Sequence, residues 1–280
     1  QRVNEPEVQT YAVKNLKKGI EFLEQQFGVK WDWDAFWKNA EMYNESSRCM
    51  IEKWDVNCTE HPQVCGAALA LQREYEFMAA ACMDKFMLKT DRRVTKMMLK
   101  GYEQDKAANA PQPKYRCLVW ACPAHYYTNF TYWTQHCWGV TCVNDMEAML
   151  SYQPITIGDK EQALADLVRC YEKMMMRSHT NGGYVNLLDE CWKMCEKFHT
   201  NIVIMYDHVS CKNVGGLHGL FEDQARERGI HLIWIPHDVM DPRTVSRREM
   251  REAFSQYMVT VLNEKPLDPT LLDYEDTLSW

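Results

Sequence analysis

Two short apolar runs in the C-terminal half of the sequence constrain the fold more than any other feature. Ile202–Tyr206 leads into a polar loop that contains Cys211 and then Gly215–Gly216, and a second run follows at His231–Ile235. Short β-branched runs that alternate with helical patterns are typical of a parallel α/β sheet. Ligands bind beyond the carboxyl ends of the strands in such sheets, so we expect Cys211 to lie at a ligand-binding edge.

The same alternation begins much earlier in the chain. Residues 117–121 and 139–143 form two further strand-like runs, separated by an aromatic helical stretch from about residue 126 to 138. Before them, residues 1–110 show four segments with apolar residues at helical spacing and require no strand. The proline-containing segment 107–113 separates the two patterns. The sequence therefore predicts a helical N-terminal region (1–110), an α/β parallel-sheet domain (114–265) and a C-terminal tail (266–280).

Two helix starts carry recognisable capping residues. Asp159, with Gln162 three residues later, is expected to cap a long helix that reaches about Arg177. Ser246 and Glu249 form a capping box that is expected to open the last helix.

Charge and hydropathy exclude two classes of partner. The 280-residue chain has a net charge of −7 that is not concentrated in blocks, which gives no electrostatic footprint for nucleic acid. No apolar run approaches the roughly 18 residues that a membrane span requires. We therefore expect neither a nucleic-acid nor a membrane partner.

The cysteines favour a reducing compartment. Twelve cysteines are compatible with a disulfide framework in a short secreted chain, but this chain is long enough to bury a core without such crosslinks. The triplets at Asn44, Asn57 and Asn129 match the glycosylation pattern, yet no signal peptide precedes them. A cytoplasmic location is the expectation. The sequence begins at Gln1 without Met, so it is compatible with a processed or partial chain.

The pair Cys191 and Cys195 lies on one face of a predicted helix. It belongs to a continuous apolar stripe that also contains Leu187, Leu188 and Trp192, so both thiols are expected to pack in the core. No C-x-x-C motif occurs and no histidine has zinc-site spacing with paired cysteines, so the sequence predicts no structural zinc site.

Cys211 has a different setting, because its loop is polar and ends in glycines. His208, Ser210 and Lys212 flank it, and these neighbours favour a reactive or metal-bound thiolate. Two roles remain open from the residues alone: a nucleophile with His208 as its base, or one ligand of a cluster whose other ligands lie elsewhere.

Two further polar loops are expected to meet Cys211 at the same edge. His125 follows the strand end at Cys122–Pro123, and Asn181 and Gly182 lie in a glycine-containing turn at a helix start. We expect these side chains and backbone groups to line a common crevice for substrate.

Three segments together resemble the 2-hydroxyacyl-CoA dehydratase and benzoyl-CoA reductase family. They are Asp207–Lys212, Gly229–Ile233 and the turn Asp238–Arg243, and the similarity is greatest to the larger-type subunits of the dehydratase component. The likeness extends more weakly to His179–Asn181 and to Cys122–Pro123. The helical first 110 residues are similar in character to the family's helical insert.

The resemblance implies a Rossmann-like fold and an iron–sulfur cofactor. Members look like two Rossmann-like domains that hold a 4Fe-4S cluster between them through three cysteines, one of which matches Cys211. This chain has one α/β block, so the N-terminal α/β domain is expected to be absent. Cys117, Cys122 and Cys137 are interpreted as packing residues and not as the other cluster ligands.

The function implied by the resemblance is that of a subunit of a (R)-2-hydroxyacyl-CoA dehydratase, an anaerobic lyase that acts as a heterodimer. A one-electron reduction would form a ketyl radical on the acyl-CoA substrate, with the electron supplied by an ATP-dependent iron–sulfur activator protein. The expected site roles are metal and cofactor binding by Cys211, catalysis by Ser210 and His208, and substrate binding by His125, Asn181, Gly182 and Lys212. A benzoyl-CoA-type aromatic acyl-CoA reductase subunit and a non-catalytic scaffold subunit are the alternatives.

Overall fold

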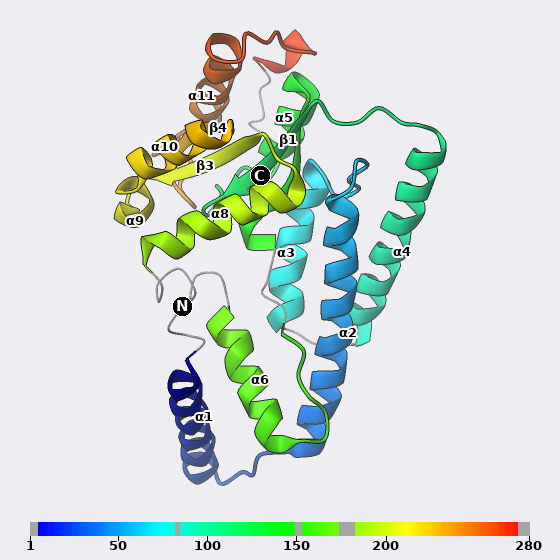
Figure 1. Ribbon diagram of the computed structural model, residues 1–280, viewed down its shortest axis with the longest axis vertical. Coiled ribbons are helices and arrows are strands. Elements are labelled where there is room, and N and C mark those ends of the chain that lie inside the picture. The colour runs from blue at the N-terminus through cyan, green and yellow to red at the C-terminus, as the bar shows by residue number, and fades with distance from the viewer. Residues whose placement is uncertain (1–4, 82–84, 149–152, 174–182, 274–280) are drawn as a thin grey trace. The chain divides into compact units, whose positions relative to one another are not determined.

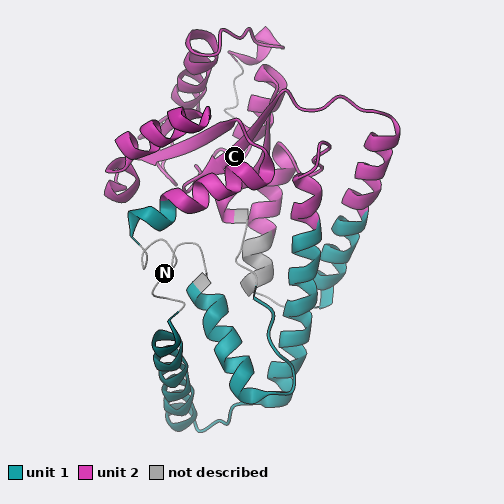
Figure 2. Ribbon diagram, in the orientation of Figure 1, with its two compact units in different colours: residues 1–52, 78–96, 150–187 teal, residues 53–77, 97–149, 188–280 magenta. Residues whose placement is uncertain are grey.

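The computed structural model describes residues 5–81, 85–148, 153–173 and 183–273 (Figure 1). The chain forms two compact units, each built from segments that are not contiguous in sequence (Figure 2). Unit 1 comprises residues 1–52, 78–96 and 150–187, and unit 2 comprises residues 53–77, 97–149 and 188–280. The predicted division at residues 107–113 marks a change of secondary structure, and the domain limits drawn there stay a prediction.

Unit 1 is helical. It contains α1 (Pro6–Phe27), most of α2 (Trp33–Asn57), the first half of α4 (Lys85–Ala107) and α6 (Lys160–Lys173). Helices α1 and α6 pack against each other, and Lys17 pairs with Glu161 between them. A small core forms around the buried side chains of Ala40, Ile155 and Ala163. The predicted helical character of the N-terminal region is confirmed.

Unit 2 contains a four-stranded parallel sheet. Its strands are β1 (Tyr115–Trp120), β2 (Val140–Asp145), β3 (Ile202–His208) and β4 (His231–His237), in the spatial order β2-β1-β3-β4. Every neighbouring pair is parallel. The predicted α/β class with a parallel sheet is therefore confirmed.

The remaining elements of unit 2 are mostly helices. They are α3 (Ala67–Ala81), α5 (Phe130–Trp138), α8 (Tyr184–Phe198), α9 (Lys212–Gly215), α10 (His218–Arg228) and α11 (Arg247–Thr260), with 3-10 turns η2 (Met146–Ala148) and η3 (Pro269–Leu271). Two of these helices cross the division, because the last residues of α3 and the first residues of α8 belong to unit 1.

Aromatic side chains attach helices to both faces of the sheet. On one face, Phe130 of α5 meets Phe254 of α11 and Tyr206 of β3, with ring centroids 5.9 and 6.2 Å apart. On the other, Phe221 of α10 contacts Trp192 of α8 and Trp234 of β4. Successive side chains of a strand point to opposite faces of the sheet, so Tyr206 and Met205 lie on different faces. Met205 is the register partner of Trp234, so Trp234 lies on the face opposite to Tyr206. The result is a sheet between two helical layers.

The strand order defines a topological switch point. The chain runs from β1 to β2 on one side of β1, and β3 then pairs with the opposite side of β1. In open parallel sheets the ligand crevice lies at the carboxyl ends of the two strands that flank such a point. Here these are the ends of β1 and β3, which are followed by Cys122 and by the Cys211 loop.

Several local predictions are confirmed. The carboxylate Oδ1 of Asp159 accepts from the backbone N–H of Glu161 and Gln162 at the start of α6. Ser246 and Glu249 form both hydrogen bonds of the capping box at the start of α11. Cys191 and Cys195 are buried, as the apolar stripe predicts.

The cysteines and the triplet asparagines also have defined environments. The eleven described cysteines are all free thiols. Asn44 is buried and exchanges hydrogen bonds with the backbone of Ile155, and the fully buried Asn57 donates to the carbonyls of Val64 and Val143. Neither asparagine can carry a glycan in the folded protein.

Within the described segments, no helix combines the length and the apolar character of a membrane span.

Candidate functional site at the strand ends

A tight turn carries the chain out of β1. Ala121 has a φ of 65°, a left-handed conformation that is uncommon for a residue with a Cβ. The turn directs the following loop, which contains Cys122 and Pro123, across the end of the sheet. The backbone N–H of His125 donates to the carbonyl of Val239 at 3.0 Å, so the loops after β1 and β4 are tied together.

A buried ion pair closes the end of β2. The guanidinium of Arg73, from α3, donates to the Asp145 carboxylate at 2.9 Å, and both side chains are almost fully buried. The second oxygen of Asp145 accepts from the backbone N–H of Glu147 at 2.8 Å, which fixes the turn η2. Burial raises the pKa of Asp145, and the nearby charge of Arg73 opposes that rise. The ion pair and its hydrogen bonds hold the side chains of Arg73 and Asp145 in a fixed position.

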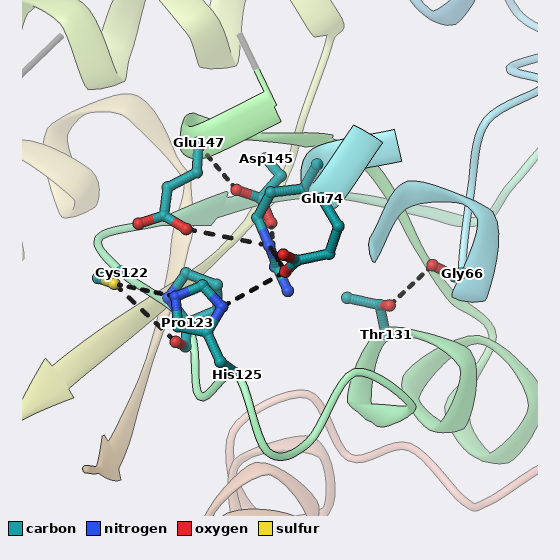
Figure 3. A network of polar contacts seen from close by, with 9 residues as sticks. Gly66, Glu74, Cys122, Pro123, His125, Thr131, Asp145 and Glu147 are labelled. Carbon is teal, nitrogen blue, oxygen red and sulfur yellow. Dashed lines mark hydrogen bonds and ion pairs between the residues drawn. The ribbon is translucent and has the colours of Figure 1, made fainter. Parts of the chain in front are cut away.

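Cys122, His125 and Glu147 converge beside this ion pair (Figure 3). One ligand atom from each lies within 4.8 Å of the others, and Sγ of Cys122 is 3.8 Å from Nε2 of His125. On the far side of the ring, Nδ1 of His125 lies 3.4 Å from a carboxylate oxygen of Glu74. Burial and the neighbouring Glu147 raise the pKa of the Cys122 thiol, so the thiol is protonated near neutral pH. Within the described segments this is the one group of three such side chains close enough to share an ion.

The loop after β3 holds Cys211 at the start of α9. Its backbone N–H donates to the carbonyl of His208 at 2.9 Å, and its own carbonyl accepts from Gly215. The backbone N–H of Ser210 donates to Nδ1 of His208 at 3.0 Å. Since Nδ1 is an acceptor, a neutral His208 carries its proton on Nε2. In that tautomer Nε2 is a hydrogen-bond donor.

A buried histidine packs against the end of β3, next to the Cys211 loop. His237, the last residue of β4, is fully buried and packs edge-on against His208 and Tyr206, with centroid separations of 5.4 and 4.9 Å. Burial lowers the pKa of His237 to about 4. The ring is therefore neutral at physiological pH and packs as an aromatic side chain.

The structure places most of the predicted site residues at one edge. His125 follows β1, His208 is the last residue of β3, and Ser210, Cys211 and Lys212 follow β3. The carboxyl ends of β1 and β3 are adjacent, because these two strands pair in parallel. The roles expected of these residues in catalysis and binding stay predictions. Asn181 and Gly182 lie outside the described residues.

The sequence alone did not identify the residues around Cys122 as part of the site, neither the carboxylates of Glu74, Asp145 and Glu147 nor Arg73. Cys117 and Cys137 are fully buried, as expected of packing residues, but Cys122 is only half-buried and lies in the polar cluster. Asp145 and Glu147 come shortly after the strand-like run 139–143, and that position points to the carboxyl edge of the sheet. Nothing local in the sequence marks Arg73 or Glu74, which arrive from a helix about 70 residues earlier.

Comparison with known protein families gives a match over most of the chain. The model of the 2-hydroxyglutaryl-CoA dehydratase D-component family matches residues 1–258 of the 280. A comparison with curated proteins finds no match. The matched range runs from the N-terminal helices through the whole sheet and into α11, and so includes both strand-end loops. The chain belongs to the 2-hydroxyglutaryl-CoA dehydratase D-component family.

Proposed function

We propose that the chain is a subunit of an iron–sulfur (R)-2-hydroxyacyl-CoA dehydratase, which removes water from its substrate through a ketyl radical formed by one-electron reduction. The observation that carries the proposal is the position of Cys211. It lies at the start of α9, beyond β3 at the switch point of the sheet, in a chain whose first 258 residues match a dehydratase component.

Cys211 fits the role of one ligand of a 4Fe-4S cluster. Such clusters are held by several cysteine thiolates, and within the described segments Cys211 belongs to no group of three metal-binding side chains. The other ligands would therefore come from outside these segments, and we propose a second α/β domain or a partner subunit as their source. When bound, the cluster would supply a low-potential electron.

The residues around Cys211 suit the binding of a thioester. His208, with its proton on Nε2, would donate a hydrogen bond to the substrate carbonyl oxygen as negative charge develops there. Ser210 is the second proposed catalytic residue beside His208, and its exposed hydroxyl offers another polar group to the substrate. Lys212, exposed on the first turn of α9, offers a cation for the phosphate groups of CoA. Asn181 and Gly182 remain proposed substrate-binding residues.

The proposed assembly has three protein components. This chain and a second dehydratase subunit form a heterodimer, and an ATP-dependent iron–sulfur activator protein delivers the electron. A reducing compartment such as the cytoplasm is compatible with the eleven free thiols.

The proposal is tested on the complex isolated under strictly anaerobic conditions through a tag on this chain. We expect iron and sulfide in the complex, and, with activator and ATP, loss of water from a 2-hydroxyacyl-CoA. Reduction of benzoyl-CoA in place of dehydration would identify an aromatic acyl-CoA reductase. Active complex that retains its iron when Cys211 is replaced would identify this chain as a scaffold.

A further inference from the structure

The cluster of Cys122, His125 and Glu147 combines three metal-binding side chains, and the dehydratase proposal uses only His125, as a substrate-binding residue. A thiol, an imidazole and a carboxylate come from the loop after β1 and the turn after β2, and their ligand atoms lie within 4.8 Å of one another (Figure 3). Neighbouring ligands of a tetrahedral zinc ion, with bonds of about 2.0–2.3 Å, lie roughly 3.5 Å apart. The 3.8 Å between Sγ of Cys122 and Nε2 of His125 is close to that separation.

The surroundings of His125 match those of a metal-binding histidine. Its Nε2 faces Cys122, and its Nδ1 lies 3.4 Å from the carboxylate of Glu74. Metal-bound histidines almost always use the second ring nitrogen to donate to a carboxylate, a carbonyl or water, which fixes the tautomer and the direction of the ring. Glu74 is itself held by Arg73, whose Nε lies 3.3 Å from it.

Glu147 points an unsatisfied oxygen into the same space. Its side chain is 14% exposed, and its Oε2 is buried and accepts no hydrogen bond from any residue in the described segments. The nearest cationic atom is Nε of Arg73, at 3.9 Å. The ion pair with Arg73 leaves this buried oxygen without a hydrogen bond, and a bound cation would satisfy it.

The charge of the cluster suits a divalent cation. Three carboxylates, those of Glu74, Asp145 and Glu147, surround a single guanidinium, that of Arg73. The carboxylates of Asp145 and Glu147 are largely buried, so their charges are screened less than charges at the surface.

We propose that Cys122, His125 and Glu147 bind one divalent ion of the zinc class, with Glu74 orienting His125 as a positioning residue. Thiolate and imidazole together favour zinc over magnesium or calcium. Three protein ligands leave a fourth position for water or a substrate oxygen, as in catalytic zinc sites. The three ligands do not include Cys211, so this proposal does not depend on a cluster at Cys211.

Metal binding by the full-length chain tests the proposal. After treatment with chelator, the protein is titrated with zinc and, separately, with cobalt, which reports its ligands in its visible and near-ultraviolet spectrum. We expect one tightly bound ion per chain, the intense visible bands of four-coordinate cobalt and a sulfur-to-cobalt charge-transfer band. Cys122→Ser should lose the charge-transfer band, and His125→Ala should weaken zinc binding more than Glu74→Gln does. Loss of the outer-shell carboxylate in Glu74→Gln should weaken binding about 10- to 100-fold.

Two variants serve as matched controls. Cys211→Ser removes the other strand-end cysteine, and His136→Ala removes an exposed histidine of α5; both should bind zinc and cobalt as the wild-type chain does. A wild-type chain that binds no zinc, or a Cys122→Ser variant with the wild-type cobalt spectrum, would overturn the proposal. If Cys122→Ser does not fold, Glu74→Gln decides, because unchanged affinity in that variant also contradicts the assignment.

Discussion

The two strand-end cysteines differ in what surrounds them. Cys122 packs beside Glu147 and is protonated because burial and that carboxylate raise its pKa. Cys211 stands at the N-terminus of a short helix beside a histidine ring that is fixed by a backbone hydrogen bond. The two proposals accordingly give these cysteines different roles, a mononuclear metal site for Cys122 and cluster ligation for Cys211.

The Arg73–Asp145 pair is expected to matter for stability. Arg73→Leu would leave Asp145 buried without its cation, and breaking a buried pair in this way typically costs about 3–5 kcal/mol. Urea denaturation of Arg73→Leu should show a loss of this size. The double variant Arg73→Leu/Asp145→Asn should recover part of it, and a single variant as stable as wild type would show that the pair contributes nothing.

His237 is expected to make stability fall in mild acid. Its folded-state pKa of about 4 lies below its ordinary value of 6.5, so the unfolded chain binds the proton more readily. The stability contributed by the neutral ring is complete above pH 6.5 and is lost as the pH falls towards 4. The loss is at most about 3 kcal/mol. Denaturation of His237→Gln across this range should show a smaller decline than wild type, and an equal decline would contradict the assignment.

At the scale of elements, local sequence patterns predicted the strands well and the start of one helix less well. The four strand runs lie within one or two residues of β1 to β4, because apolar β-branched runs between turn residues specify strands directly. The aromatic helix α5 begins at Phe130, later than the predicted residue 126. Tyr126 instead belongs to the loop, where its hydroxyl donates to the carbonyl of Val245 at 2.6 Å. That tertiary contact leaves no local trace in the sequence.

The capping box of α11 allows a direct test of a local prediction. Ser246→Ala removes the side-chain oxygen that accepts from the backbone N–H of Glu249, and should cost about 1 kcal/mol of unfolding free energy. Ser246→Asp keeps an acceptor and should retain most of the stability. Equal stability of wild type and Ser246→Ala in urea would mean that α11 does not depend on its cap.

At the scale of the whole molecule, the sequence predicted the edge of the sheet but not the full site. Parallel strands bring their carboxyl ends together whatever the loops contain, so the topology alone places His125 and Cys211 at one edge. The Cys122 cluster also needs Glu74 and Arg73 from α3, whose approach to β2 depends on long-range packing. The two units could not be predicted from the sequence for the same reason, because each is built from segments that are distant in sequence.

The chain is expected to be inactive by itself. Cys211 lacks companions for a cluster within the described segments, so we expect activity to require the second subunit and the activator. Size-exclusion chromatography and anaerobic assays of the separately purified chain check this expectation. A lone chain that dehydrates or reduces an acyl-CoA would contradict both the missing ligands and the need for an activator.

The most direct test of the central claim is the iron and acid-labile sulfide content of the anaerobically isolated complex, compared between wild type and Cys211→Ser. Serine is a good helix N-cap, so the variant should keep its fold and its circular dichroism. The account predicts that iron, sulfide and visible absorbance are present in wild type and lost in the variant, while zinc is retained in both. Wild-type iron and sulfide in Cys211→Ser would contradict it.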